Sequence, residues 1–226
     1  MPQNNKAPYD VLYEDEDIVV VYKKRDVFSV STNDPATFTH NLFQYLQWRA
    51  NRNHEKVLVV HRLDYETSGV MIFAKKPEVK ERLQAAFEAR KVGRFYEAVI
   101  QEKIPLGEAH HVEQYLLEEG PRVSVSDAEH GKLAITDIAA SNYIQIGTAL
   151  AISIGSGRHN QIRLALKSLN YTLLGDKRFA DNTAKRLYLN AYKLSFPAEI
   201  GLKKSEFIVT PLWLDKLPET SAPAKN

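Results

Sequence analysis

Residues 112–155 restrict the possible folds more than any other part of this sequence. The stretch holds four runs in which apolar and polar side chains alternate, and turn signals at Gly120-Pro121 and His130-Gly131 separate successive runs. Alternation with a period of two is typical of strands that bury one face. Because the runs follow one another across short turns, they predict an antiparallel meander.

The end of this stretch contains twenty residues without a formal charge, from Ile138 to Gly157, which is about the length that a membrane-spanning helix needs. The pattern of residues in this segment argues against a membrane span. Polar residues and glycines interrupt it, and from Ile144 through Ile154 the larger apolar residues tend to fall on every second position. The segment therefore predicts a β-hairpin.

Short strands and amphipathic helices make up the rest of the chain. Asp17–Lys23 contains a β-branched run typical of a strand, whereas Thr37–Asn51 has apolar side chains on one helical face and a threonine that can cap it. The expected strands are 17–23, 57–60, 70–74, 95–100, 186–192 and 206–209, and the expected helices are 37–51, 78–91 and 160–169. Strands outnumber helices and occur in runs, so we predict an α+β fold with a large, mostly antiparallel sheet.

The composition fits one folded unit of ordinary globular type. The chain has 226 residues, of which 44% are hydrophobic, enough for a substantial core. Its polar ends predict a disordered N-terminus over 1–8, a single domain over 9–214 and a flexible tail over 215–226. No apolar signal segment opens the sequence, so we expect a cytoplasmic protein. The absence of cysteine excludes disulfides, thiolate metal sites and cysteine nucleophiles.

Charge is distributed unevenly along the chain, although the net charge is only +2. Residues 49–94 carry eleven Lys and Arg against six Asp and Glu, and residues 155–190 carry seven against two, so each block has a net charge of +5. Residues 101–137 carry three basic and eight acidic residues, a net charge of −5. The two basic blocks suit an anionic partner such as a nucleic acid, but solvated faces that differ in charge by chance would give the same pattern.

The segment VHRLDYETSG, from Val60 to Gly69, is the most informative part of the sequence. The two short apolar strands expected on either side would hold its polar side chains rigidly. Asp64 follows His61 and Arg62, and a neighbouring cation favours the ionised form of a carboxyl group. An ionised Asp in a cleft can act as a nucleophile or an electrostatic stabiliser, but these residues alone would equally suit a surface ion pair in a connecting loop.

The longer pattern decides between these interpretations. His61-Arg62-Leu63-Asp64 followed by Thr67-Ser68-Gly69 resembles the HRLD-x-x-TSG signature of the RluA-type pseudouridine synthases, which isomerise uridine within RNA. Other segments resemble further motifs of that family in the same order along the chain: 13–23, the tyrosine-centred 94–99, 131–136, 157–163 and 175–191. The resemblance covers about residues 13–197, nearly the whole expected domain.

The resemblance also implies roles for particular side chains. Asp64 would be the catalytic nucleophile, Tyr96 would lie against the target base with its hydroxyl available for proton transfer, and Arg163 would pair with Asp64. Other motif residues are expected to bind the substrate RNA: His61, Arg62, Thr67, Arg94, Arg158 and Gln161. The implied fold is a long mixed sheet divided into two halves, with flanking helices and with Asp64 at the floor of a central cleft.

These residue types suit the isomerisation. A uridine stacked inside folded RNA cannot react, so it must swing out, at a cost of roughly a few kcal/mol, and be held by an aromatic ring or a guanidinium group. The glycosidic bond then breaks, the uracil turns, and its C5 atom bonds to the ribose. No redox step or external group transfer occurs, so we expect no cofactor and no metal ion.

Some residues around the expected site depart from the family pattern. The Thr-His pair of the family's GRTHQIR motif is His159-Asn160 here, the histidine of the closing strand is Asn190, and the turn after the first strand reads Lys23-Lys24-Arg25-Asp26. The chain has no room before residue 9 for an additional N-terminal RNA-binding domain, so we expect the catalytic domain itself to select the substrate. We expect a monomer. The sequence identifies neither the RNA nor the uridine.

Other interpretations stay open. A catalytically silent RNA-binding or RNA-folding protein would keep the same scaffold. A glycosidase acting through Asp64 would release free uracil and would need a second carboxylate close by. His110 and His111 lie near Glu113 and could bind a metal ion, but their spacing matches no established metal motif.

Overall fold

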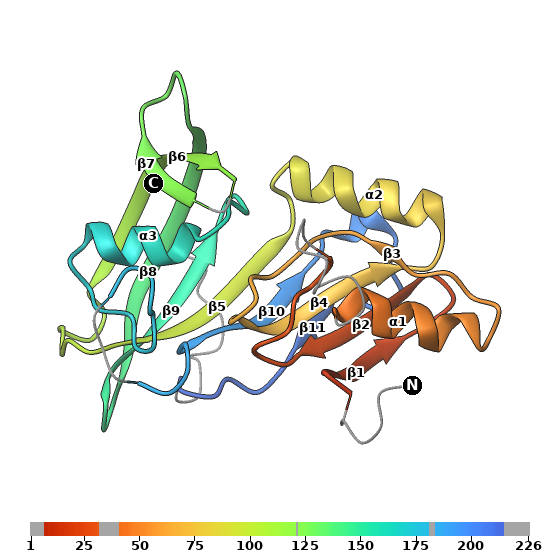
Figure 1. The fold of residues 1–226 in the computed structure, drawn as a ribbon, viewed down its shortest axis with the longest axis horizontal. Coiled ribbons are helices and arrows are strands. Elements are labelled where there is room, and N and C mark those ends of the chain that lie inside the picture. The colour runs from red at the N-terminus through yellow and green to blue at the C-terminus, as the bar shows by residue number, and fades with distance from the viewer. Residues whose placement is uncertain (1–6, 32–40, 121, 181–183, 215–226) are drawn as a thin grey trace.

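Eleven strands join in one sheet in the computed structural model, which describes residues 7–31, 41–120, 122–180 and 184–214 (Figure 1). The strands are β1 (Tyr9–Glu14), β2 (Ile18–Lys23), β3 (Leu58–Val59), β4 (Ser68–Ala74), β5 (Gly93–Ile100), β6 (Ala109–Glu119), β7 (Arg122–Ser126), β8 (Lys132–Ile144), β9 (Gly147–Ile154), β10 (Leu189–Ser195) and β11 (Glu206–Ile208). The helices are α1 (Leu42–Asn51), α2 (Pro77–Glu88), α3 (Gln161–Ser168) and the short 3-10 helix η2 (Ala198–Ile200).

The sheet is mixed and mostly antiparallel, as predicted. Its order is β1-β2-β4-β10-β5-β9-β8-β6-β7, and β3 pairs with β4 while β11 pairs with β10. Among the described strands, β10 and β4 form the one parallel pair. The order brings the strand after the segment 61–67 next to a strand from near the C-terminal end of the chain.

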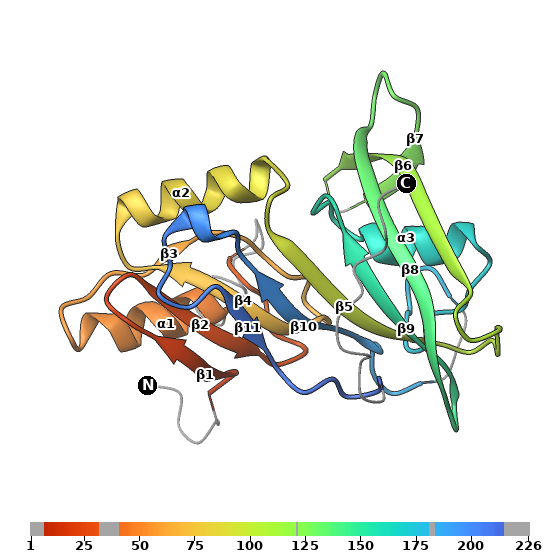
Figure 2. The same cartoon turned by 180° about the vertical axis from the view of Figure 1, so that it is seen from behind.

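Both faces of the first half of the sheet are buried. In β2, Val19 and Val21 pack in the same core as α1, whereas Ile18 and Val20 pack in the core that contains α2. Figure 1 and Figure 2 show the two helices on opposite sides of β2 and β4. Since successive strand residues point to opposite faces, a strand covered on both sides is apolar throughout, which explains the continuous apolar run of β2.

The second half of the sheet is antiparallel, but its order is not that of the predicted meander, because β8 returns beside β6 and leaves β7 at the edge. Strand β6 pairs with β7 and β8, and β8 pairs with β9, all in antiparallel register, while α3 packs on this half. Strands β8 and β9 form the predicted hairpin, whose last pair is Ile144 with Gly147. Within the described ranges, no helix is long and apolar enough to cross a bilayer.

Strand β5 connects the two halves. Its residues from Gly93 to Ala98 pair with β10, and those from Phe95 to Ile100 pair with β9. In Figure 2, β5 runs from beside α2 to the region of β9. Side chains of β5 therefore lie at the junction of the halves, where the cleft was expected.

Some boundaries differ from the expected ones. Helix α1 begins at Leu42, after Asn41, whose side chain accepts a hydrogen bond from the Gln44 N–H at 2.9 Å. The predicted cap Thr37 lies outside the described residues. Strand β1 was not among the predicted strands, because its sequence YDVLYE mixes exposed apolar and polar residues at the edge of the sheet. The predictions for the chain ends fall mostly on residues 1–6 and 215–226, which lie outside the described part.

Candidate active site

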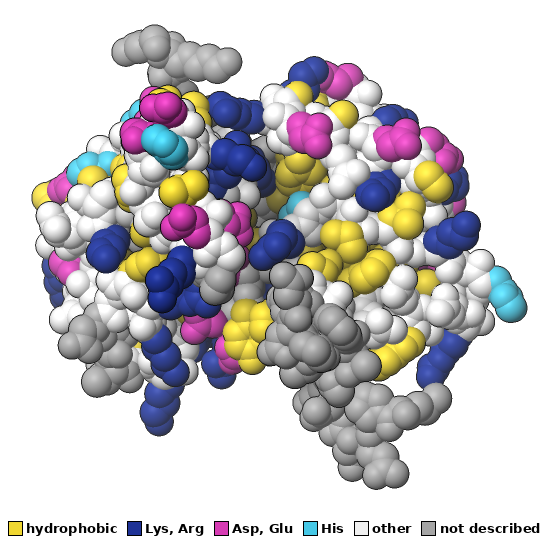
Figure 3. Space-filling view, turned by 45° about the horizontal axis from the view of Figure 1, so that its top comes forward, with side chains coloured by type: hydrophobic (Ala, Val, Ile, Leu, Met, Phe, Trp, Pro, Cys, Tyr) yellow, Lys and Arg dark blue, Asp and Glu magenta, His cyan; other side chains and the backbone are white. Residues whose placement is uncertain are grey.

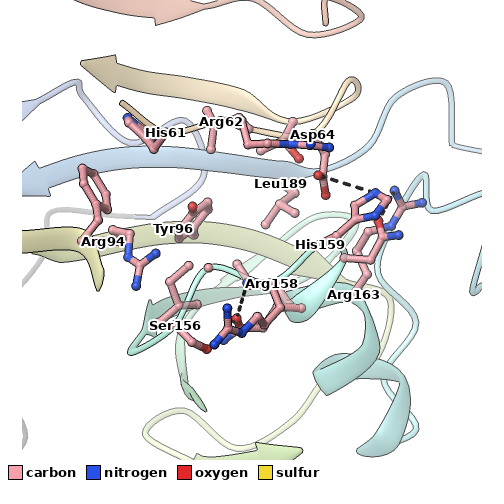
Figure 4. A pocket seen from close by; sticks show the side chains of 18 of the residues that line it. His61, Arg62, Asp64, Arg94, Tyr96, Ser156, Arg158, His159, Arg163 and Leu189 are labelled. Carbon is pink, nitrogen blue, oxygen red and sulfur yellow. Dashed lines mark hydrogen bonds and ion pairs between the residues drawn. The ribbon is translucent and has the colours of Figure 1, made fainter. Parts of the chain in front are cut away.

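A pocket of about 380 Å³ lies between the two halves of the sheet (Figure 4). The segment 61–67, strand β5 and the turn between β9 and α3 all contribute to its walls. All nine residues predicted from the sequence for the site line this pocket: His61, Arg62, Asp64, Thr67, Arg94, Tyr96, Arg158, Gln161 and Arg163. The pocket corresponds to the expected central cleft.

The backbone on both sides of Asp64 is fixed by hydrogen bonds. The Ser29 hydroxyl donates to the Leu63 carbonyl oxygen at 2.6 Å and accepts from the Leu63 N–H at 3.0 Å. The completely buried Lys23 ammonium donates to the Tyr65 carbonyl oxygen at 3.1 Å. The Asp64 carboxylate, with 24% of its side chain exposed, thus faces the pocket from a rigid support.

Gly69 allows β4 to run directly beside β10. It pairs with Ala191 in the parallel register and has a φ of 140°. An added Cβ would lie 2.3 Å from the Ala191 carbonyl oxygen and 2.5 Å from the Ala191 Cβ. Glycine tolerates both the backbone conformation and the close approach, which gives a physical reason for the last residue of the HRLD-x-x-TSG pattern.

Tyr96 lies in β5, with its ring at the pocket wall between Asp64 and Arg94 (Figure 4). Only 9% of the residue is exposed. Burial raises the pKa of the Tyr96 hydroxyl to about 12. The phenol is therefore neutral around pH 7, and it offers a flat aromatic surface together with one O–H group.

Arg94 is a buried cation that has no acidic partner within the described part of the chain. It is two residues from Tyr96 in β5 and therefore points to the same face, where its guanidinium packs over the Phe87 ring at 5.6 Å. Arg94 is 8% exposed, its Nε has no hydrogen-bond partner among the described residues, and burial lowers its pKa. A buried guanidinium left unpaired costs free energy, so this wall of the pocket suits an anionic ligand.

Arg163 does not form the predicted ion pair with Asp64. Its Nε donates to Asp176 Oδ2 at 2.9 Å, its Nη2 contacts the other oxygen of the same carboxylate, and its Nη1 lies 3.1 Å from Glu66 Oε2. Arg163 is 3% exposed and Asp176 is 1% exposed. The bidentate geometry in a buried setting explains why Asp176 holds this guanidinium. Asp64 acts on Arg163 through space, without a direct contact.

The basic group that approaches Asp64 is an imidazole. His159 Nε2 lies 3.9 Å from Asp64 Oδ1, drawn as a dashed line in Figure 4. Among the described residues this is the one ion-pair contact of Asp64. His159 belongs to the turn between β9 and α3, so the contact joins the two sides of the pocket.

Two of the residues predicted to bind RNA form hydrogen bonds inside the protein. The His61 Nε2 accepts the Ile72 N–H at 3.1 Å, and burial together with the Arg94 charge lowers the pKa of His61 to about 3, so the ring is neutral. The Gln161 amide donates to the Ile135 carbonyl oxygen at 2.7 Å and accepts from the Ser156 hydroxyl at 2.8 Å. These bonds do not support the prediction that His61 or Gln161 contacts RNA through its polar atoms.

The remaining predicted residues form the rim and the floor. Arg62 and Arg158 are exposed at the pocket, whereas Thr67 is buried. The lining has five arginines, Arg62, Arg90, Arg94, Arg158 and Arg163, against three carboxylates, Asp64, Glu88 and Glu118. Figure 3 shows Lys and Arg side chains around the hollow between the two halves. The site is therefore basic overall, although it contains a carboxylate at its centre.

Among the described residues, no group of three or more His, Asp or Glu side chains is arranged to hold a metal ion. His110 and His111 follow each other in β6, so their side chains point to opposite faces of the sheet. His110 contacts Glu108 and Tyr171, whereas His111 contacts Asp137. The alternative of a metal site at this histidine pair therefore lacks the converging geometry that it needs.

A model of the family described as RNA pseudouridylate synthase matches residues 17–168. The chain belongs to this family. Ribosomal large subunit pseudouridine synthase D of Salmonella typhimurium is 31% identical over 172 residues, which are 75% of this chain and 52% of the relative. The protein of the same name from Escherichia coli strain K12 is 30% identical over 171 residues, again 75% and 52% of the two chains. This pseudouridylate synthase family member therefore spans about half the length of these relatives.

Solved structures show that the fold is that of the pseudouridine synthases. Human RNA Pseudouridylate Synthase Domain Containing 4 has a TM-score of 0.72 at 19% identity, over 91% of this chain and 88% of that chain. Human RNA Pseudouridylate Synthase Domain Containing 1 has a TM-score of 0.73 at 18% identity, over 95% and 88%. The RluA-type resemblance and the predicted fold are thus confirmed.

Three residues at this pocket were not predicted as functional. Asp176 and Glu66 hold Arg163, and His159 contacts Asp64. Asp176 lies in a segment that resembles a family motif, so its place in the pattern was a usable signal. The sequence contains no such signal for His159, because the chain departs from the family motif at this position.

Proposed function

We propose that this chain isomerises uridine to pseudouridine in structured RNA. The observation that carries the proposal is that Asp64, Tyr96 and Arg163 line one pocket within a member of the RNA pseudouridylate synthase family. A volume of about 380 Å³ is within the usual range of small-molecule sites and allows a single extruded nucleotide. The reaction proposed here needs no cofactor.

The proposed roles follow from the chemistry of each group. Asp64 acts as the nucleophile or assists the departure of uracil, and its rigid backbone keeps the carboxylate aimed at the sugar. Tyr96 packs against the flipped base, and its neutral hydroxyl takes part in proton transfer at the ribose. Arg163, fixed by Asp176, contributes positive charge behind Asp64 without a direct contact.

The arginines of the pocket are proposed to bind RNA phosphates. Arg94 has no acidic partner among the described residues, and Arg62 and Arg158 are exposed beside it. Binding to phosphates releases counterions, so RNA affinity should fall with increasing salt. Because the relatives named above are ribosomal large subunit synthases, we propose the RNA of the large ribosomal subunit as the substrate. A monomeric state and a cytoplasmic location stay predictions.

The proposal is tested with total RNA labelled with [5-³H]uridine, taken from cells that lack the gene. Formation of pseudouridine releases tritium from C5, so wild-type protein should release it and Asp64→Asn should not. The matched control is Asp10→Asn, a substitution in the edge strand β1 away from the pocket, which should release tritium as the wild type does.

The other outcomes distinguish the alternatives. RNA binding without tritium release by the wild type would overturn the proposal in favour of a silent RNA-binding protein. Free uracil as product would identify a glycosidase. Mapping pseudouridines in cellular RNA with and without the gene would then identify the RNA and the uridine.

A further inference from the structure

His159 lies between two carboxylates that come from different parts of the fold. Its Nε2 is 3.9 Å from Asp64 Oδ1, and its Nδ1 is 3.3 Å from Glu118 Oε1. Asp64 belongs to the segment before β4, and Glu118 belongs to β6 in the other half of the sheet. The side chain of His159 is 19% exposed. Each nitrogen of the imidazole thus lies within 4 Å of an acidic oxygen, and Nδ1 forms no hydrogen bond with any described residue.

Charged groups of both signs surround this imidazole. Asp64 and Glu118 face the ring directly, and Arg158 and Arg163 are the basic groups of its own segment. The Arg163 guanidinium is already bound to Asp176 and Glu66, so it does not neutralise Asp64 through a direct contact. A histidine changes its charge between about pH 5 and pH 8, unlike an arginine. The direct basic partner of Asp64 is therefore an imidazole and not a permanently charged guanidinium.

The histidine at position 159 distinguishes this chain from the family pattern. In the motif that residues 157–163 resemble, the corresponding residue is a threonine, which carries no charge. The chain has thus placed a titratable group next to its proposed nucleophile. The threonine also provides a natural comparison, because His159→Thr restores the pattern of the motif.

We propose that His159 is a positioning residue, whose imidazolium bridges Asp64 and Glu118 and holds the Asp64 carboxylate in its working orientation. The inference rests on the proposed isomerase activity. When the ring loses its proton, the bridge is lost and Asp64 becomes free to rotate. The rate of the chemical step should therefore fall as pH rises through the range in which His159 deprotonates.

The first experiment measures single-turnover tritium release between pH 5.5 and 8.5, with protein saturating over the labelled total RNA. Wild type should lose activity as pH rises, by about tenfold across the range, since a factor of ten corresponds to one modest charge interaction. His159→Thr should be slow and independent of pH. His159→Lys keeps a cation at every pH, so it should be faster than His159→Thr at pH 8.5.

The comparison of the wild type with His159→Thr distinguishes an effect of His159 from the effects of other titrating groups. The pKa values of about 3 for His61 and about 12 for Tyr96 lie outside the range. Burial lowers the pKa of Lys23 to about 7, so Lys23 can contribute a step of its own. A pH dependence that persists unchanged in His159→Thr would belong to Lys23 or another group and would overturn the inference. A flat wild-type profile would overturn it as well.

The second experiment does not depend on activity. The titration of the His159 Cε1–H proton is followed by NMR in the wild type, in Asp64→Asn and in Glu118→Gln. Each substitution removes one carboxylate from the ring, so each should move the titration to lower pH. An unchanged titration in both variants would contradict the bridge. If wild type releases no tritium but the titrations shift, the proposed function fails while the contact stands.

Discussion

The guanidinium of Arg163 and the carboxylate of Asp176 form a buried, bidentate ion pair at the edge of the pocket, with 3% and 1% of the two side chains exposed. The same carboxylate accepts the backbone N–H groups of Arg178 and Phe179. The pair therefore ties α3 to the segment after residue 175. It also fixes a positive charge in the pocket wall without placing it against Asp64.

Removing one partner of this pair should strongly destabilise the protein. Arg163→Met leaves the Asp176 carboxylate buried and unpaired, which costs about 3–5 kcal/mol in the free energy of unfolding. Urea denaturation measures the loss. Lys91→Met, which breaks the exposed ion pair with Glu199, is the control and should have a much smaller effect. Equal effects of the two substitutions would contradict the structural importance of the buried pair.

Gly69→Ala should destabilise the protein far more than an alanine substitution at another glycine that has a positive φ. The new Cβ would meet the Ala191 carbonyl oxygen at 2.3 Å, so β4 and β10 would have to separate. Gly107→Ala is the matched control, because Gly107 has a φ of 81° and nothing within 4 Å of an added Cβ. The control should lose about 1 kcal/mol from backbone strain alone. Thermal or urea unfolding of both variants should separate strain from steric overlap.

The partly buried His61 should make the stability of the protein depend on pH in the acidic range. Burial and the Arg94 charge lower its pKa from 6.5 to about 3, so below pH 6.5 the unfolded chain binds a proton that the folded protein does not bind. The free energy of unfolding should therefore fall as pH drops from 6.5 towards 3, by up to roughly 1.4 kcal/mol per pH unit. His61→Gln, whose amide oxygen can accept the Ile72 N–H, should reduce this slope in urea titrations.

The control for that experiment is His54→Asn, on an exposed turn with a φ of 56°. Asparagine tolerates this backbone conformation, and the site is solvated, so the pH slope should remain that of the wild type. If His54→Asn and His61→Gln change the slope equally, the burial of His61 is not its cause.

Arg94→Leu should weaken RNA binding without destabilising the fold. The substitution removes a buried cation whose Nε has no partner among the described residues, and leucine suits the contact with Phe87. The logarithm of RNA affinity against the logarithm of salt concentration should become less steep by about one. Arg52→Gln, at the exposed end of α1, should leave both quantities unchanged. A loss of stability together with unchanged RNA affinity would show that Arg94 is a structural residue.

Much of the fold was predictable because it follows from local pattern. The alternating stretch 112–155 became antiparallel strands in β6 to β9, although their order is not that of the predicted meander, and the continuous apolar run of β2 became a strand covered on both faces. Strand β1 was not predicted, since an edge strand is solvated and its sequence lacks a clear alternation. The residues of the site were predictable from the ordered motifs, and all nine line one pocket.

The contacts that the site residues form within the protein could not be predicted from the motifs. Arg163 was predicted to pair with Asp64 and is held by Asp176. The hydrogen bond from the Gln161 amide to the Ile135 carbonyl oxygen was not predicted, and RNA binding by Gln161 stays a prediction. A motif records which residue types occur and in what order. It does not specify which acceptor binds a guanidinium or an amide in the folded protein. That depends on competing groups from segments that are distant in the sequence.

By itself, the sequence determined the strand and helix pattern, the family resemblance and the residues that share the pocket, because periodicity and motif order are local properties of the chain. The tertiary structure alone decided that Asp64 faces His159, that Asp176 holds Arg163 and that Arg94 contacts no acidic side chain among the residues described. These relationships depend on distances of a few ångströms between segments far apart in the chain. Electrostatic and hydrogen-bond energies change steeply over such distances, so only the packed arrangement of the two halves could fix them.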